Sequence, residues 1–420
     1  MKPAGKPVLV LISTGPRLYR EYLLRSIAAR YRIHLLTGSD PAWALPYLDG
    51  VVVLPDMGTD AVVSAAQRLA AQLPVAGVLT WAEDHTVDSA RAAAALGLPG
   101  PSAAAALACR DKLATRSALA AHGVPQPEFA DVSDVDEAQT AAAKIGYPVV
   151  LKPRAGVASE GVVKVDDPTQ LAEEFPASRD VPAPDVPLSS QAVLVEEYLT
   201  GPEISVDSVV QGGRVTPVFV ARKEIGFAPY FEETGHLVSS GDPLLTDSGL
   251  LGVLARVHAA LGYTDGCTHA ELKLTPDGPK LIEVNGRLGG DLIPYLGMRA
   301  TGIDPGLAAA AVACGQPPDL SPRAEGVAGI RFFYPPWPRT LISSVGFDLT
   351  CLPAAGLDLL DLLAPLVDAG ATVSQPGRGL MDGRIALATS VAPTEQECRS
   401  ALDHAQAALS CTWSPAVPDT

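Results

Sequence analysis

Residues 269–285 read His-Ala-Glu-Leu-Lys-Leu-Thr-Pro-Asp-Gly-Pro-Lys-Leu-Ile-Glu-Val-Asn. Two runs of alternating residues flank a central Thr-Pro-Asp-Gly-Pro segment, which is typical of a turn, so the stretch predicts a β-hairpin. If the hairpin is symmetric about Asp277, Glu271 lies opposite Glu283 and His269 lies opposite Asn285. These four side chains then share one face. The other face carries four apolar side chains: Ala270, Leu272, Ile282 and Val284.

The opposed glutamates call for a compensating charge. Directly opposed residues have Cβ atoms about 5 Å apart, and like charges at that separation destabilise a sheet. A cation between them resolves the repulsion, and carboxylate and amide oxygens are ligands that suit Mg²⁺. The hairpin alone is equally consistent with a solvated face on which the glutamates pair with Lys273 and Lys280.

Two lysines and a loop of small residues shift this balance. Lys112 opens a helix predicted over residues 111–122, and Lys152 ends a strand predicted over residues 147–152. Residues 154–161 then form a small-residue loop before a second strand, at 162–165. Such a loop can bring backbone N–H groups against phosphate oxygens and close as a lid. The order of two lysines, a loop and an acidic pair favours a nucleotide site.

At this point the sequence resembles the ATP-grasp superfamily, from about residue 110 to residue 313. The matching motifs are Arg-Asp-Lys at 110–112, Gly-Val-Pro-Gln-Pro at 123–127, Tyr-Pro-Val-Val-Leu-Lys-Pro at 147–153, Ser-Glu-Gly-Val at 159–162, Val-Glu-Glu-Tyr-Leu-Thr-Gly-Pro-Glu at 195–203 and Glu-Val-Asn-Gly-Arg at 283–287. They occur in the order of the family.

The resemblance implies a set of site residues. Those implied for ATP are Lys112, Lys152, Ser159, Gly161, Glu196, Glu197, Tyr198, Leu199 and Glu203. Those implied for two Mg²⁺ ions, with Mn²⁺ as an alternative, are Glu271, Glu283 and Asn285. Arg287 would face the transferred phosphate and stabilise the reacting oxygens, with Lys152 as the second catalytic group.

Within the superfamily, three motifs are most similar to the L-amino-acid ligases that make dipeptides. They are His-Ala-Glu at 269–271, Glu-Thr-Gly-His at 233–236 and the run from Glu283 to Asp291. Glu233 and His236 would bind or deprotonate the amine substrate, or form a satisfied surface pair. His269 would support the metal ligands, and Asp291 would either hold a substrate ammonium or cap the following helix.

This resemblance implies an ATP-dependent ligase that joins two amino acids through an acyl phosphate and releases ADP and phosphate. A purine-pathway ligase with a phosphoribosyl substrate is one alternative. A nucleotide-binding regulatory protein without turnover is another, although the lysines and carboxylates needed for turnover are all present. The implied partners are small-molecule carboxylates and amines, and a homodimer is an open alternative to a monomer.

The expected fold class is α/β, with α+β character in the ATP-binding part. Buried strands predicted at 8–12, 33–37, 51–54 and 75–80 alternate with helices, which predicts a doubly wound parallel sheet over residues 1–103. The ATP-grasp domain follows at 104–322, with a lid at about 123–195, and then a C-terminal α+β domain at 323–420. Residues 175–190, rich in Pro, Ala and Asp, predict a surface loop.

The composition of the chain argues against nucleic-acid, zinc and membrane partners. With 31 basic and 47 acidic residues, the net charge of −16 argues against a nucleic-acid partner. The six cysteines form no CxxC pair, which disfavours a zinc site and fits a reducing cytoplasm. No apolar run is long enough to span a bilayer, so we expect a cytoplasmic protein without a membrane partner.

Overall fold

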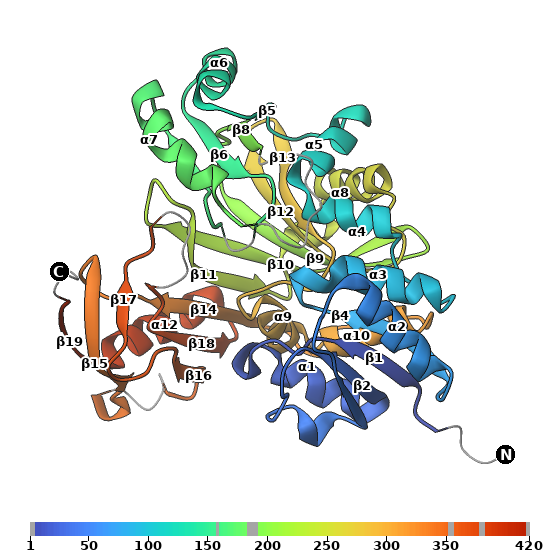
Figure 1. The fold of residues 1–420 in the computed structure, drawn as a ribbon. Helices are drawn as coiled ribbons and strands as arrows, with labels where there is room; N and C mark the ends of the chain where they lie inside the picture. The colour runs from blue at the N-terminus through green and yellow to red at the C-terminus, as the bar shows by residue number, and fades with distance from the viewer. Residues whose placement is uncertain (1–4, 157–158, 183–191, 352–356, 378–382, 417–420) are drawn as a thin grey trace.

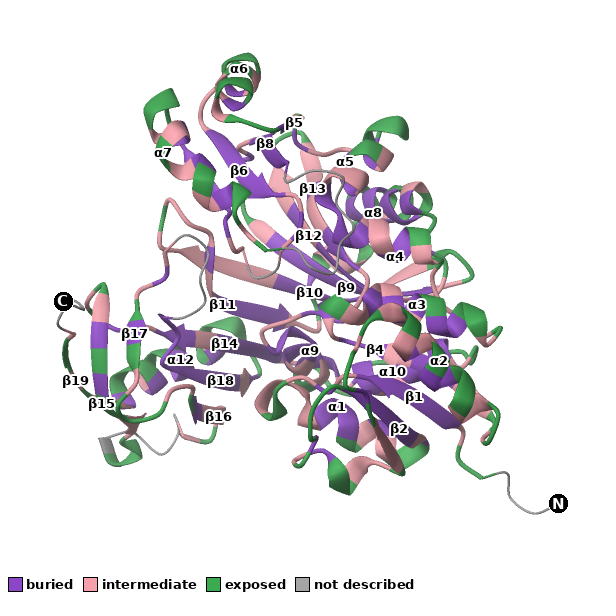
Figure 2. Cartoon of the chain, in the orientation of Figure 1, coloured by how far each residue is buried: buried purple, intermediate pink, exposed green. Residues whose placement is uncertain are grey.

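A computed structural model describes residues 5–156, 159–182, 192–351, 357–377 and 383–416. A parallel sheet at the N-terminus is followed by antiparallel sheets with helices packed on them (Figure 1), which confirms the expected fold class. The strands of the N-terminal and central sheets are largely buried, and the outer faces of the helices are exposed (Figure 2).

The N-terminal sheet is doubly wound, as predicted. Its strands β1 (Val8–Ile12), β2 (Arg32–Thr37), β3 (Gly50–Val53) and β4 (Val75–Thr80) are parallel, in the order β3-β2-β1-β4. Leu9 and Leu11 share a core with α1 (Arg17–Arg30). Val10 and Ile12 point the other way, towards α2 (Thr59–Ala70) and α3 (Thr86–Ala95). Successive side chains of β1 thus point to opposite faces of the sheet, and helices pack on both faces.

An eight-stranded sheet runs through the rest of the molecule, in the order β13-β12-β9-β10-β11-β14-β18-β16. Its strands are β9 (Glu203–Gln211), β10 (Arg214–Gly226), β11 (Glu232–Ser239), β12 (Gly266–Thr275), β13 (Gly278–Asn285), β14 (Val327–Phe333), β16 (Leu360–Pro365) and β18 (Ala386–Ala392). Strands from both sides of the expected boundary at residue 323 share this sheet. The three-domain division stays a prediction.

Helices cover this sheet, and a separate smaller sheet shares a hydrophobic core with its C-terminal strands. The helices are α4 (Ala103–Arg110), α5 (Lys112–Ala121), α8 (Ser248–Leu261), α9 (Ile293–Thr301), α10 (Pro305–Ala313) and α12 (Glu395–Ala408). A three-stranded sheet has the order β17-β15-β19, from β15 (Arg339–Phe347), β17 (Thr372–Ser374) and β19 (Leu409–Pro415). The 3-10 turns are η1 (Leu45–Tyr47), η2 (Glu83–His85), η3 (Pro243–Thr246) and η4 (Leu349–Cys351).

The expected lid is a four-stranded sheet with two helices, at the top of Figure 1. Its order is β5-β8-β6-β7, from β5 (Phe129–Val132), β6 (Val149–Pro153), β7 (Val163–Val165) and β8 (Val193–Glu197), with α6 (Val135–Ile145) and α7 (Pro168–Arg179). The prediction of a loop from residue 175 is wrong for its first part, because α7 continues to Arg179. Phe175 is buried in the lid core, and this burial holds the last turn despite Pro176. Residues 183–190 of that predicted loop lie outside the described residues.

The predicted hairpin forms from β12 and β13, with Glu271 opposite Glu283 and His269 opposite Asn285. One detail is wrong. A bulge follows Glu271, so that Leu272 pairs with Leu281 and Ile282 has no partner in the register. Leu281 therefore enters the core, and Ile282 lines a cavity beside Glu283.

Helix α9 packs closely on β10 at Gly297, which gives a test of the packing. A β-carbon added there would lie 2.3–2.5 Å from ring atoms of Phe219. We expect Gly297→Ala to lower the free energy of unfolding by about 1–3 kcal/mol, measured by urea denaturation. Gly252→Ala is the control, since no atom lies within 4 Å of its added β-carbon in α8, and it should raise stability by about 0.5–1 kcal/mol. Equal changes in the free energy of unfolding for Gly297→Ala and Gly252→Ala would contradict the close contact between Gly297 and Phe219.

Candidate active site

A cavity that is open to solvent, with about 720 Å³ of empty space including part of that solvent, lies between the lid and the hairpin face of the central sheet. Lid strands β6 and β8 supply one wall, and β9, β12 and β13 supply the other. Most of the residues implied for ATP and metal line it: Lys112, Lys152, Ser159, Glu196, Glu197, Tyr198, Leu199, Glu203, Glu271 and Glu283. These residues span more than 170 positions of the sequence, and the fold brings them together around one cavity.

The strand β8 brings Glu196 into contact with two buried cations. Arg116 binds its carboxylate through Nε at 2.7 Å and Nη2 at 3.1 Å, and Lys152 Nζ lies 3.1 Å away. Burial would raise the pKa of Glu196, but the charges of Arg116 and Lys152 outweigh it and lower the pKa to about 2. Arg116 also donates to the carbonyl oxygens of Leu281 and Ile282, so it ties the lid strand to β13.

The two opposed glutamates each contact a lysine. Lys112 Nζ lies 3.4 Å from Glu283, and Lys223 Nζ lies 2.8 Å from Glu271. The oxygen donors on this face, with Asn285 at its end, fit a divalent cation such as Mg²⁺. Lys273 and Lys280 do not pair with Glu271 and Glu283, which was the alternative expected from the sequence. Lys273 instead contacts Glu203, and Lys280 contacts Glu197.

His269 lies on the same hairpin face as Glu271 and contacts it. Its Nδ1 lies 2.8 Å from Asp207, and its Nε2 lies 3.5 Å from Glu271. Asp207 also accepts a hydrogen bond from the backbone N–H of Gly289. His269 therefore connects Glu271 to the segment after β13, and its role beside a metal ligand stays a prediction.

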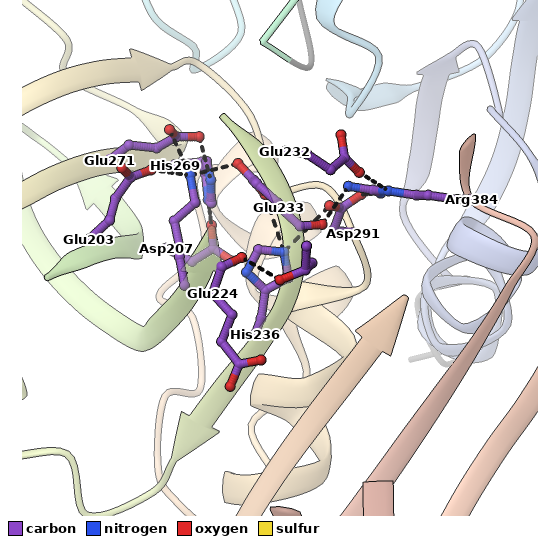
Figure 3. Close-up of polar contacts among 12 residues, drawn as sticks. Glu203, Asp207, Glu224, Glu232, Glu233, His236, His269, Glu271, Asp291 and Arg384 are labelled. Atoms are coloured by element: carbon purple, nitrogen blue, oxygen red, sulfur yellow. Dashed lines mark hydrogen bonds and ion pairs between the residues drawn. The ribbon is translucent and has the colours of Figure 1, made fainter. Parts of the chain in front are cut away.

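A second polar cluster adjoins the cavity and joins the central sheet to the C-terminal part (Figure 3). His236 Nε2 lies 3.2 Å from Glu233 and 3.4 Å from Asp291. Arg384 Nη1 lies 2.8 Å from Asp291, and its Nε lies 2.8 Å from Glu232. Burial would raise the pKa of Asp291, but Arg384 and His236 hold it well below its usual value.

Charge favours the protonated form of His236. Burial would lower its pKa, but hydrogen bonds to Asp291 and Glu233 outweigh this and raise it. Asp291 does not cap the following helix, which corrects that alternative: the N-cap of α9 is Leu292, without a side-chain hydrogen bond. The carboxylate of Asp291 instead faces His236 and Arg384.

Three of the residues predicted for ATP, metal or catalysis do not line the cavity: Gly161, Asn285 and Arg287. Arg287 forms an ion pair with Glu83 of the N-terminal part and donates to the carbonyl oxygen of Leu288, so it does not line the cavity. Gly161 lies against α7, where its carbonyl oxygen accepts a hydrogen bond from Ser178. Its φ of +69° explains why glycine stands there.

Three cations that organise the site were not predicted from the sequence: Arg116, Lys223 and Arg384. Arg116 lies one turn after Lys112 on α5, and this spacing on one helix face was the available signal. Lys223 and Arg384 carry no local motif. Their partners lie on neighbouring strands that only the fold brings together.

Comparison with known proteins assigns the chain to a family. Residues 145–295 match the ATP-grasp domain family. A D-alanine–D-alanine ligase of Aromatoleum aromaticum is 30% identical over 233 residues, which cover 53% of this chain and 71% of that ligase. The chain belongs to the ATP-grasp family of carboxylate–amine ligases. Ligases of this family use ATP and Mg²⁺.

Other relatives act on different substrates. Human carnosine synthase 1 is 32% identical over 270 residues, covering 60% of this chain and 33% of that protein, so the match spans a third of its length. A phosphoribosylamine–glycine ligase of Yersinia pestis is 29% identical over 274 residues, covering 58% of this chain and 63% of that ligase.

The fold is shared along nearly the whole chain. The crystal structure of an L-amino acid ligase from Bacillus licheniformis superposes with a TM-score of 0.77 at 22% identity, covering 97% of this chain and 98% of that one. In the described ranges, no helix combines the length and apolar character needed to cross a membrane.

The buried pair of Arg116 and Glu196 gives a stability prediction. Arg116→Met leaves Glu196 with one of its two cations, and we expect a loss of about 3–5 kcal/mol in the free energy of unfolding at pH 7. A lowered pKa contributes stability that is present above the ordinary value of 4.5 and is lost as the pH falls towards 2. Between pH 7 and pH 4, the free energy of unfolding of the wild type should therefore fall by roughly 1 kcal/mol more than that of the variant.

Urea denaturation at both pH values measures this difference. Arg179→Met is the control, because Arg179 and Asp180 form an exposed pair with 43% and 59% of their side-chain surfaces accessible. It should change stability by less than about 0.5 kcal/mol. A gap between wild type and Arg116→Met that does not narrow at pH 4 would contradict the assigned charge of Glu196.

Proposed function

We propose that the protein uses ATP to join the carboxylate of one amino acid to the amino group of another. A carboxylate oxygen attacks the γ-phosphate and ADP leaves, which gives an acyl phosphate. The amine then attacks the acyl carbon, loses a proton, and phosphate leaves with one of the carboxylate oxygens. The supporting observation is the single cavity that joins buried lysines of the lid to the opposed glutamates of the hairpin.

The residues of the cavity fit the phosphate end of ATP. Lys112 and Lys152 both line the cleft and would bind phosphate oxygens. Glu271, Glu283 and Asn285 would hold magnesium, which neutralises phosphate charge during transfer. The segment from Glu196 to Leu199 would bind the adenine, and Glu203 the ribose hydroxyls. Arg287 would act on the transferred group only after its ion pair with Glu83 opens.

The cluster around His236 would receive the amino-acid substrates. Since its raised pKa favours protonated His236, the carboxylates of Glu233 and Asp291 are the groups that would attract a substrate ammonium. A protonated His236 would in turn attract a substrate carboxylate. The names of the similar carnosine synthase and D-alanine–D-alanine ligase support amino-acid substrates.

Mass spectrometry of reactions with ATP, Mg²⁺ and pooled L-amino acids tests the proposal. We expect a dipeptide mass together with ADP and phosphate. Glu283→Ala should lower the rate at least about a hundredfold, because the variant loses a metal ligand that acts in the transition state. Asp277→Asn, in the exposed turn of the same hairpin, should keep the wild-type rate.

The other outcomes point to other functions. AMP and pyrophosphate as products would contradict an acyl-phosphate route. Turnover only with a phosphoribosyl amine would indicate a purine-pathway ligase. ATP binding without turnover of any carboxylate and amine pair would favour a regulatory protein.

A further inference from the structure

The ammonium group of Lys223 contacts three carboxylates at once. Its Nζ lies 2.8 Å from Glu203, 2.6 Å from Glu233 and 2.8 Å from Glu271. The lysine is on β10, and its partners are on β9, β11 and β12, so one ammonium joins four adjacent strands. Only 1% of its side-chain surface is accessible.

The ammonium occupies the place that a metal ion would take among these carboxylates. One oxygen from each of the three glutamates lies within 4.8 Å of the others, and Lys223 sits between them. Both oxygens of Glu271 already face a nitrogen: Oε2 lies 2.8 Å from Lys223 Nζ, and Oε1 lies 3.5 Å from His269 Nε2. A divalent cation that binds Glu271 must therefore displace Lys223 from it or share it against charge repulsion.

We propose that Lys223 is an internal cation that competes with the divalent metal for Glu271, so that the metal binds well only when ATP brings its phosphates. This inference rests on the proposed function for the metal ligands. It adds a positioning residue: without nucleotide, Lys223 neutralises Glu271, and with nucleotide the phosphates supply the negative charge that lets a metal and the lysine lie close together. Glu203 and Glu233 also contact Lys223 and would keep it within reach after nucleotide binds.

Binding of Mn²⁺ to the nucleotide-free protein tests this exchange, followed by electron paramagnetic resonance of free Mn²⁺. We expect K223Q to bind Mn²⁺ at least about tenfold more tightly than the wild type, because the carboxylates lose their ammonium. K223R keeps the charge and should bind as weakly as the wild type. K273Q is the matched control: Lys273 contacts Glu203 in the same cluster but is not paired with Glu271, so its affinity should stay within about threefold.

Equal affinities of K223Q and wild type, or equal gains in K223Q and K273Q, would overturn the proposal. If K223Q is unfolded without metal, Mn²⁺ should restore its fold by circular dichroism, and failure to do so would also overturn it. A parallel titration with a non-hydrolysable ATP analogue separates this question from the proposed function. A wild type that binds no Mn²⁺ even with the analogue would refute the metal assignment itself.

Discussion

The structure depends on one electrostatic constraint, the placement of Glu271 directly opposite Glu283 on a two-stranded hairpin. Opposed like charges destabilise a sheet unless cations lie between or beside them. Here Lys112 from α5 and Lys223 from β10 supply those cations. The helix, the central sheet and the hairpin must therefore be arranged so that ammonium groups and carboxylates converge, and this convergence forms the floor of the cavity.

The ion pairs also connect parts of the chain that have to act together. Arg116 links the lid strand β8 to the backbone of β13, so the strand assigned to adenine and the strand assigned to metal share one buried guanidinium. Arg384 links the C-terminal part to Asp291 and Glu232. Under the proposed mechanism, substrates that fill the cavity would exclude water and so protect an acyl phosphate from hydrolysis.

Features that depend on residues near one another in the sequence could be predicted from the sequence alone. The hairpin register followed from side-chain alternation and turn residues, and the parallel strands followed from short apolar runs. The bulge after Glu271 could not be predicted, because the local pattern fits a regular hairpin equally well. The end of α7 was missed because Pro176 indicates a loop by composition, whereas the burial of Phe175 is a tertiary effect. Likewise, the positions of Arg287 and Lys223 depend on Glu83 and Glu233, on elements that only the folded chain brings near.

The central claim is that these charges promote transfer of the γ-phosphate to a carboxylate. Its most direct test is a reaction with ATP, the amine substrate and a carboxylate substrate labelled with ¹⁸O on both oxygens, followed by mass analysis of the phosphate released. The account predicts one ¹⁸O atom in each phosphate, since the bridging oxygen of an acyl phosphate leaves with phosphorus. Unlabelled phosphate, or label found in AMP, would contradict it.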